Sequence, residues 1–180
     1  LAAGCLNSQR VPADTAAGPP VKPGRIAGDN IPTAWRGSKT AREWTSIVLH
    51  HTATETGSVE SIHADHRRRT TRGKPWLGIG YHFVIGNGKG MPDGAVEPTF
   101  RWRDQLHGAH AGHQGYNQHG IGIALIGHFD RQPPPPAQLA SLRRLIAHLR
   151  TAHRIPASGL VGHGDIKSTA CPGRLFPLAT

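Results

Sequence analysis

A chain of 180 residues, 37% of them hydrophobic, is long enough for one domain with its own core. It has no run of about twenty apolar residues, which excludes a membrane-spanning helix, and its 23 glycines and 15 prolines predict many loops. The net charge of +10 indicates either an anionic partner (nucleic acid, an anionic lipid surface or an acidic cell-wall polymer) or simply a well-solvated basic surface. The four tryptophans are too scattered to form a stacking platform, which argues against nucleic acid.

The first five residues are Leu1-Ala2-Ala3-Gly4-Cys5. They resemble a bacterial lipobox, although the leucine lies one place further from the cysteine than in the usual pattern. We therefore expect an exported protein of the cell envelope, in the periplasm or at the outer membrane, with a lipid on Cys5 as a membrane tether. The alternative is an ordinary cysteine in a tail.

Residues 1–30 are rich in proline, alanine and glycine and predict a flexible tether, followed by one folded domain over residues 31–180.

The first predicted strand covers Ser46–His51, where aliphatic and β-branched residues precede two histidines. Side chains alternate across a strand, so His50 and His51 point to opposite faces and only one can reach a given site. Ser58 is a plausible N-cap for a basic helix that ends around Arg69.

The rest of the chain alternates short aliphatic strands with helical segments. A mixed sheet covered by helices, an α/β fold, is therefore expected. Pro156 stops the last long helix. The further elements expected, in order, are a strand over Tyr81–Ile85, a turn at Asn87-Gly88, a weaker strand over Ala95–Thr99, a core strand over Ile121–Ile126, an amphipathic helix from about Leu139 to Arg154 and a strand at Leu160-Val161.

His163 and Cys171 lie eight positions apart on a glycine-punctuated loop near the end of the chain. Imidazole and thiolate are ligands that zinc prefers, and three protein ligands with one open position are typical of a catalytic zinc site. His50, His163 and Cys171 are the candidate set. Most of the other histidines are expected to be structural or exposed, and a disulfide between Cys5 and Cys171 is not expected.

Five motifs in order extend this hypothesis. They are Leu49-His50-His51-Thr52-Ala53-Thr54, Gly80-Tyr81-His82-Phe83-Val84-Ile85, Gly108-Ala109-His110, Ile121-Gly122-Ile123, and His163 followed by Thr169-Ala170-Cys171-Pro172-Gly173. Together they resemble the zinc-dependent N-acetylmuramoyl-L-alanine amidases, the type-2 amidase family shared by phage lysozyme-like amidases and peptidoglycan recognition proteins. The resemblance covers roughly Ser46 to Gly173 and implies the fold of the peptidoglycan recognition proteins, with a central mixed sheet flanked by helices.

The resemblance implies one zinc ion per chain, held by His50, His163 and Cys171, and thus selects His50 over His51. Related amidases that process anhydro-muropeptides carry a glutamate in the strand matching Ile121–Ile126 and an aspartate as third ligand. This chain has Ala124 and Cys171 at those positions. It is therefore similar to the phage and recognition-protein branch, and no carboxylate is evident as a general base.

The same resemblance implies catalytic roles for Tyr81 and Thr169, and substrate contacts for His110 and Asn117, although an insertion separates the last two. The implied reaction is hydrolysis of the amide between the lactyl group of N-acetylmuramic acid and L-alanine of the peptidoglycan stem peptide. A zinc-activated water would attack, and Tyr81 would stabilise the charge on the carbonyl oxygen. We expect a monomer. The alternative function is a non-catalytic peptidoglycan-binding module, since recognition proteins that lose activity typically lack the cysteine.

Overall fold

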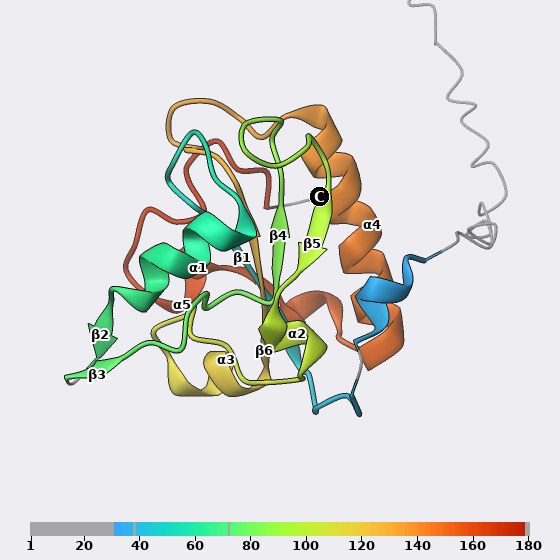
Figure 1. Cartoon of the computed structure of the whole chain (residues 1–180). Helices are drawn as coiled ribbons and strands as arrows, with labels where there is room; N and C mark the ends of the chain where they lie inside the picture. Colours follow the sequence, from blue (N-terminus) through green and yellow to red (C-terminus); the bar gives the residue numbers. More distant parts are fainter. Residues whose placement is uncertain (1–30, 38, 72, 179–180) are drawn as a thin grey trace, which may run out of the picture. The chain divides into compact units, whose positions relative to one another are not determined.

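The computed structural model describes residues 31–37, 39–71 and 73–178 (Figure 1). The expected tether and Cys5 lie outside these ranges. The strands are β1 (Ser46–His51), β2 (Thr70–Thr71), β3 (Lys74–Pro75), β4 (Phe83–Ile85), β5 (Val96–Pro98), β6 (Gly120–Leu125) and β7 (Leu160–Gly162). The α-helices are α1 (Val59–Arg67), α2 (Phe100–Arg103), α3 (Gln114–His119), α4 (Pro136–His153) and α5 (His163–Ile166), with 3-10 turns η1 (Thr33–Arg36) and η2 (Ala157–Gly159).

Five strands form the expected mixed sheet, in the order β5-β4-β6-β1-β7. The β4-β6, β6-β1 and β1-β7 pairs are parallel, and β5 runs antiparallel to β4. Strands β2 and β3 form a separate two-stranded ribbon beyond the end of α1 (Figure 1). None of the helices within the described ranges is long and apolar enough to cross a bilayer.

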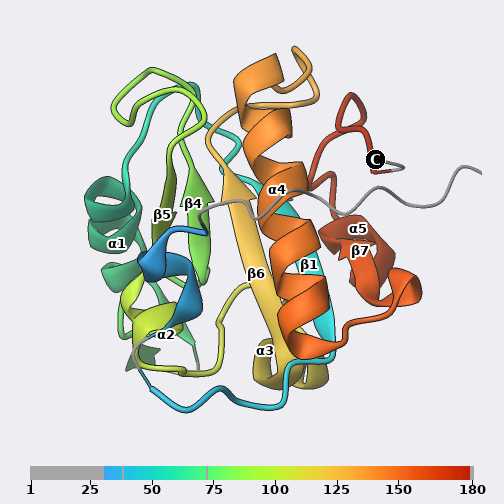
Figure 2. The same ribbon diagram turned by 90° about the vertical axis from the view of Figure 1, so that its right-hand side faces the viewer.

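Helix α4 covers one face of the sheet and α1 lies on the other (Figure 2). Strand β6 shows why the two faces differ, because its large residues Ile121, Ile123 and Leu125 all pack in the core beneath α4. The residues between them, Gly122 and Ala124, face the other way and are small. The sheet therefore leaves room for other side chains on its second face.

Helix α1 begins as predicted, with Ser58 in a capping box: its hydroxyl accepts from Ser61 N, and the Ser61 hydroxyl accepts from Ser58 N. It ends at Arg67, two residues before the expected end. Helix α4 begins at Pro136, the last of four prolines, because proline is favoured in a first helical turn. It ends at His153, and the next residue, Arg154, caps it with a left-handed backbone.

Some elements differ from the prediction. Strand β4 begins at Phe83 rather than at Tyr81, although His82 continues its hydrogen bonding by donating its backbone N–H to Gly122 O. The β4–β5 connection is not a two-residue turn at Asn87-Gly88 but a longer loop over residues 86–95. The β2–β3 ribbon and helices α2 and α3 were not predicted, because these segments carry no clear apolar period.

The parallel pairing of β1 with β7 sets up the functional end of the sheet. Leu49 pairs with Gly162, so the next residues of both strands, His50 and His163, emerge side by side at their carboxyl ends. The Asp165 carboxylate accepts the Gly162 N–H at 2.8 Å and fixes the turn that starts α5. A short helix thus begins at His163 itself.

Candidate metal and active site

Three side chains of metal-ligating type converge at this edge of the sheet. His50, His163 and Cys171 each offer one ligand atom, and these atoms all lie within 4.8 Å of one another. His50 comes from the end of β1, His163 from the start of α5 and Cys171 from the loop that follows α5. The donor set of two imidazoles and one thiol fits zinc, and its members are those expected from the sequence.

Both histidines present a free Nδ1 to this group. The Nε2 of His163 lies 3.1 Å from the carbonyl oxygen of Ala111, and the Nε2 of His50 lies 3.0 Å from His110 Nδ1. The Nδ1 of His50 then lies 3.6 Å from the sulfur of Cys171. Metal-binding histidines generally have their second nitrogen held by such a partner.

The loop that carries Cys171 is anchored on both sides of the sulfur. The backbone N–H of His51 points at the sulfur, 3.4 Å away, and the Thr169 hydroxyl accepts from the Cys171 N–H at 3.3 Å. Gly173, with φ of 105°, packs so closely on Phe129 that a Cβ there would lie 2.6 Å from the Phe129 carbonyl carbon. Only glycine therefore lets this loop close over the sheet.

The electrostatics of the group suit it to binding a cation. Burial, together with the nearby His110 and His163, holds the pKa of His50 well below its usual value. Burial also lowers the pKa of His163 and raises that of the Cys171 thiol to about 11. Both imidazoles are therefore neutral at pH 7, as metal ligands must be, and the thiol needs a bound cation to lose its proton.

Tyr81 lies beside this group, directly before β4. Its ring centroid is 5.1 Å from that of His50, and burial, followed by the neighbouring Cys171, raises the pKa of its hydroxyl. Nothing among the described residues hydrogen-bonds this hydroxyl. Gly80 permits the placement, because a Cβ there would lie 2.2 Å from the Ala109 carbonyl oxygen. The hydroxyl is thus available to a bound molecule.

A cavity of about 930 Å³ opens next to the metal-binding group. Four of its lining side chains are cationic, and no carboxylate lines it among the described residues. Its walls come from the end of α1, the β2–β3 ribbon, the loop before β4, α2, the loop before α3, α3 itself, and α5 with the residue that follows it. The lining residues are His66, Arg69, Thr71, Lys74, Pro75, Trp76, Leu77, Tyr81, Arg101, His107, Gly108, Ala109, His110, Gly112, Gln114, Asn117, Gln118, His163 and Lys167.

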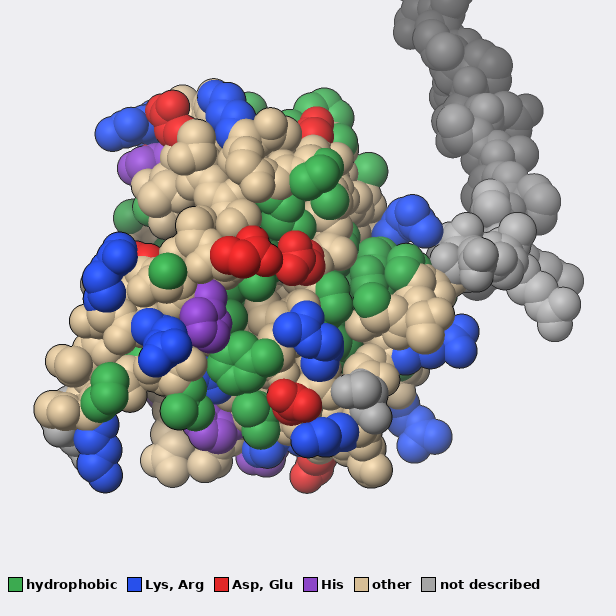
Figure 3. Space-filling view, viewed as in Figure 1, with side chains coloured by type: hydrophobic (Ala, Val, Ile, Leu, Met, Phe, Trp, Pro, Cys, Tyr) green, Lys and Arg blue, Asp and Glu red, His purple; other side chains and the backbone are tan. Residues whose placement is uncertain are grey.

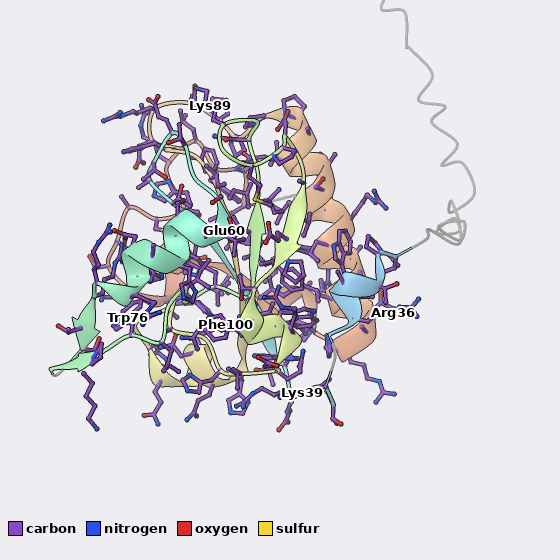
Figure 4. The ribbon with its side chains drawn as sticks, viewed as in Figure 1. Arg36, Lys39, Glu60, Trp76, Lys89 and Phe100 are labelled. Atoms are coloured by element: carbon purple, nitrogen blue, oxygen red, sulfur yellow. The ribbon has the colours of Figure 1, made fainter. Side chains whose placement is uncertain are left out.

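Trp76 and Arg69 form part of the cavity wall. Trp76 lies between α1 and the ribbon (Figure 4), and its indole N–H donates to Thr71 at 2.7 Å. Arg69 lies 5.8 Å from the Trp76 ring. Lysine and arginine side chains are prominent on this side of the molecule (Figure 3). The wall is therefore both aromatic and basic.

The other predicted site residues occupy different positions around the group. His110 is buried and both of its ring nitrogens contact protein, whereas its ring also lines the cavity. Asn117 lines the cavity too, and its side-chain oxygen accepts from the backbone N–H groups of His110 and Ala111, each at 2.9 Å. Thr169 is exposed and is absent from the cavity lining. Roles for these three residues in binding or catalysis stay predictions.

A second cluster lies on the opposite face of β1, where His51, His128 and Asp130 place ligand atoms within 4.8 Å of one another. The backbone N–H of Phe129 donates to His51 Nδ1 at 3.2 Å. This bond puts the ring proton of neutral His51 on Nε2, so neither nitrogen is free for a cation. The His51 side chain thus holds the loop after β6, on the face of β1 opposite to His50, as strand alternation had predicted.

Sequence reasoning singled out neither of two buried residues that line the cavity, His66 and Arg101. His66 is buried, accepts from Gly80 N at 3.0 Å and has its pKa lowered to about 4 by burial. Arg101 is 2% exposed, and its guanidinium donates to the carbonyl oxygens of Ile79 and His107 rather than to a carboxylate. Neither carries a local sequence signal, because the partners of both are backbone atoms of other segments.

Comparison with known proteins agrees with this geometry. A family model described as N-acetylmuramoyl-L-alanine amidase matches residues 40–174. The chain belongs to the N-acetylmuramoyl-L-alanine amidase family. Membership in this family supports peptidoglycan amidase activity in broad terms and confirms the resemblance inferred from the motifs.

One curated relative of this amidase-family chain is a recognition protein and another is a phage endolysin. A peptidoglycan-recognition protein of Drosophila simulans is 36% identical over 137 residues, which cover 71% of this chain and 68% of the relative. The endolysin of Klebsiella phage KP32 is 32% identical over 139 residues, covering 74% of this chain and 83% of the endolysin.

Solved structures confirm the fold. The endolysin amidase LysCS from Clostridium intestinale has a TM-score of 0.63 and 33% identity, with 75% of this chain and 78% of that chain covered. Peptidoglycan recognition protein-LE, solved with tracheal cytotoxin (a monomeric diaminopimelic acid-type peptidoglycan), has a TM-score of 0.58 and 27% identity; 74% and 76% of the two chains are covered.

Proposed function

We propose that this protein is a zinc-dependent amidase that hydrolyses the bond between the lactyl group of N-acetylmuramic acid and L-alanine of the peptidoglycan stem. The observation that carries the proposal is the convergence of His50, His163 and Cys171 beside a cavity that both His163 and Tyr81 line. Zinc held by these three residues would supply Lewis acidity and an activated water at neutral pH.

The protein's own groups would position the amide and stabilise the developing charge. The Tyr81 hydroxyl keeps its proton at neutral pH because burial raises its pKa, so it can donate a hydrogen bond to the carbonyl oxygen. The sheet offers no carboxylate here, since Ala124 pairs with His50 in the register of β6 and β1. Tyr81 is therefore the residue of this chain that we assign to transition-state stabilisation.

The cavity fits an anionic substrate. Arg101 is buried without a carboxylate partner, and Arg69, Lys74 and Lys167 also line the cavity. A buried cation is costly unless it meets an opposite charge, and the carboxylates of a stem peptide would supply one. The structural relative solved with a diaminopimelic acid-type fragment supports a substrate of this kind.

A non-catalytic binding module is the alternative. Such a protein needs the cavity but has no need of a metal or of the sulfur donor. Cys171 is held in place by the His51 N–H and by Thr169, and it completes a three-donor set. This arrangement favours catalysis over binding alone.

The test is digestion of a defined muropeptide that contains the lactyl–alanine bond, read by mass spectrometry. We expect two products, the glycan with a free lactyl carboxylate and the peptide with a free alanine amine. Prior removal of metal by a chelator should abolish cleavage, and added zinc should restore it. Full activity after exhaustive zinc removal, or cleavage at another bond, would refute the proposal.

A further inference from the structure

Two histidines form a continuous hydrogen-bonded chain beneath the metal-binding group. The Nε2 of His110 lies 3.2 Å from the carbonyl oxygen of Gly120. Its Nδ1 lies 3.0 Å from His50 Nε2, and His50 Nδ1 lies 3.6 Å from the Cys171 sulfur. The chain therefore runs from the backbone of β6 to the site of the metal.

The hydrogen bond between His110 and the Gly120 carbonyl fixes the donor and acceptor of the other hydrogen bonds in this chain. A carbonyl oxygen only accepts, so the proton of His110 must be on Nε2, and its Nδ1 is left as an acceptor. His50 must then donate from Nε2, which leaves its Nδ1 without a proton and free to bind a cation. We infer that His110 is a positioning residue that fixes His50 in its metal-binding tautomer; this inference rests on the proposed function.

The ring of His110 is held in one place by close packing. A Cβ on Gly108 would lie 2.3 Å from the ring, and one on Gly122 would lie 2.5 Å from it. The neighbouring ring of His82, bonded to Leu106 O and Gly122 N, meets His110 edge-on at 5.7 Å. These contacts leave His110 little freedom to turn and release His50.

The same short segment orients the other histidine ligand. The carbonyl oxygen of Ala111, the residue after His110, receives the proton on His163 Nε2. The side-chain oxygen of Asn117 then holds both residues, because it accepts the N–H groups of His110 and Ala111. One loop thus sets the tautomers of both imidazoles, through a side chain for His50 and through the backbone for His163.

The tautomer of His50 can be read directly by long-range ¹H–¹⁵N NMR of the metal-free protein, and zinc affinity by competition with a chromophoric chelator. In the wild type we expect the His50 proton on Nε2. In His110→Phe we expect a mixture of tautomers and zinc binding about 10- to 100-fold weaker. His110→Gln should restore most of the affinity, because its amide can accept from His50 and donate to Gly120.

A matched control is His153→Phe, which replaces a half-buried histidine that packs edge-on against Trp102 in the core and does not line the cavity. It should leave the tautomer unchanged and zinc affinity within about twofold. Asn117→Leu is a second variant that leaves both rings intact; it should also weaken zinc binding, whereas Asn117→Asp keeps the acceptor and should not.

The inference is overturned if wild-type His50 carries its proton on Nδ1, a result that does not depend on any variant folding. It is also overturned if His110→Phe binds zinc as the wild type does. The proton position in the metal-free protein tests the orienting chain, whereas cleavage of the muropeptide amide by the wild type tests the proposed function. Failure of one therefore remains distinct from failure of the other.

Discussion

Replacing Tyr81 by phenylalanine is the sharpest test of the catalytic assignment. From the structure we expect this substitution to lower activity while leaving the stability of the protein almost unchanged. The hydroxyl has no hydrogen-bond partner among the described residues, so its loss breaks nothing in the folded protein. The ring itself would remain, packed 5.1 Å from His50 and 5.5 Å from His66.

The expected magnitudes follow from this separation. Loss of one donor to a developing oxyanion costs about 2.7–4 kcal/mol, or roughly a 100- to 1,000-fold lower kcat. The free energy of unfolding should change by less than about 1 kcal/mol, since no buried hydrogen bond is lost. For a domain of this size that corresponds to a shift in Tm of no more than about 2–4 °C. Zinc affinity should not change, because Tyr81 is not a ligand.

The assay is the initial rate of muropeptide cleavage, with zinc content and thermal unfolding measured on the same preparation. The other tyrosine of the chain, Tyr116, provides the control: it lies on α3 against His113 and does not line the cavity. Tyr116→Phe should retain activity within about twofold. A Tyr81→Phe enzyme with wild-type kcat would refute the role given to the hydroxyl.

Three further predictions concern the metal, pH and packing. Cys171→Ser should weaken zinc binding by more than the roughly 100-fold that loss of a supporting residue costs; unchanged zinc content in this variant would place the third ligand elsewhere. His66 has a pKa of about 4 when folded against 6.5 when unfolded, so the unfolded state binds more protons between these values. The free energy of unfolding of the metal-free protein should therefore fall as pH drops from 6.5 to 4, and His66→Gln should reduce the slope by up to about 1.4 kcal/mol per pH unit in urea titrations. An unaltered slope would contradict the buried, neutral state of His66. Gly122→Ala would place a Cβ 2.5 Å from His110 and should cost about 1–3 kcal/mol in the same assay. Gly115→Ala, in α3 with only ordinary contacts, should be neutral or stabilising by up to about 1 kcal/mol; equal effects of the two would count against the close packing at His110.

The sequence predicted the central elements well because local chemistry dominates there. The run Ser46–His51 is aliphatic and β-branched, and the structure forms β1 over those same residues. The apolar spacing after Pro136 predicted α4 in the same way. Helix α3 was not predicted because none of its residues is buried, so its sequence lacks the apolar spacing that indicates a helix.

The three candidate metal ligands could be singled out from the sequence because histidine and cysteine at a strand end and on a glycine-rich loop are chemically distinctive, and the structure brings them together. Their partners could not be singled out. The contact of His110 with His50 joins residues 60 positions apart and depends on the glycines that leave space for the ring. The burial of Arg101 likewise depends on carbonyl groups supplied by two other loops. Such contacts form only when distant segments pack together, so no periodic pattern in the nearby sequence indicates them.

The wide separation of the sulfur and its nearest imidazole along the chain bears on how the polypeptide folds. Cys171 and His50 are 121 positions apart, so their meeting requires β7 to have docked beside β1. Long-range contacts of this kind form late and slowly compared with helices and hairpins. Metal capture would then mark the end of folding rather than start it, in contrast to a zinc finger, whose ion drives the collapse of a short peptide.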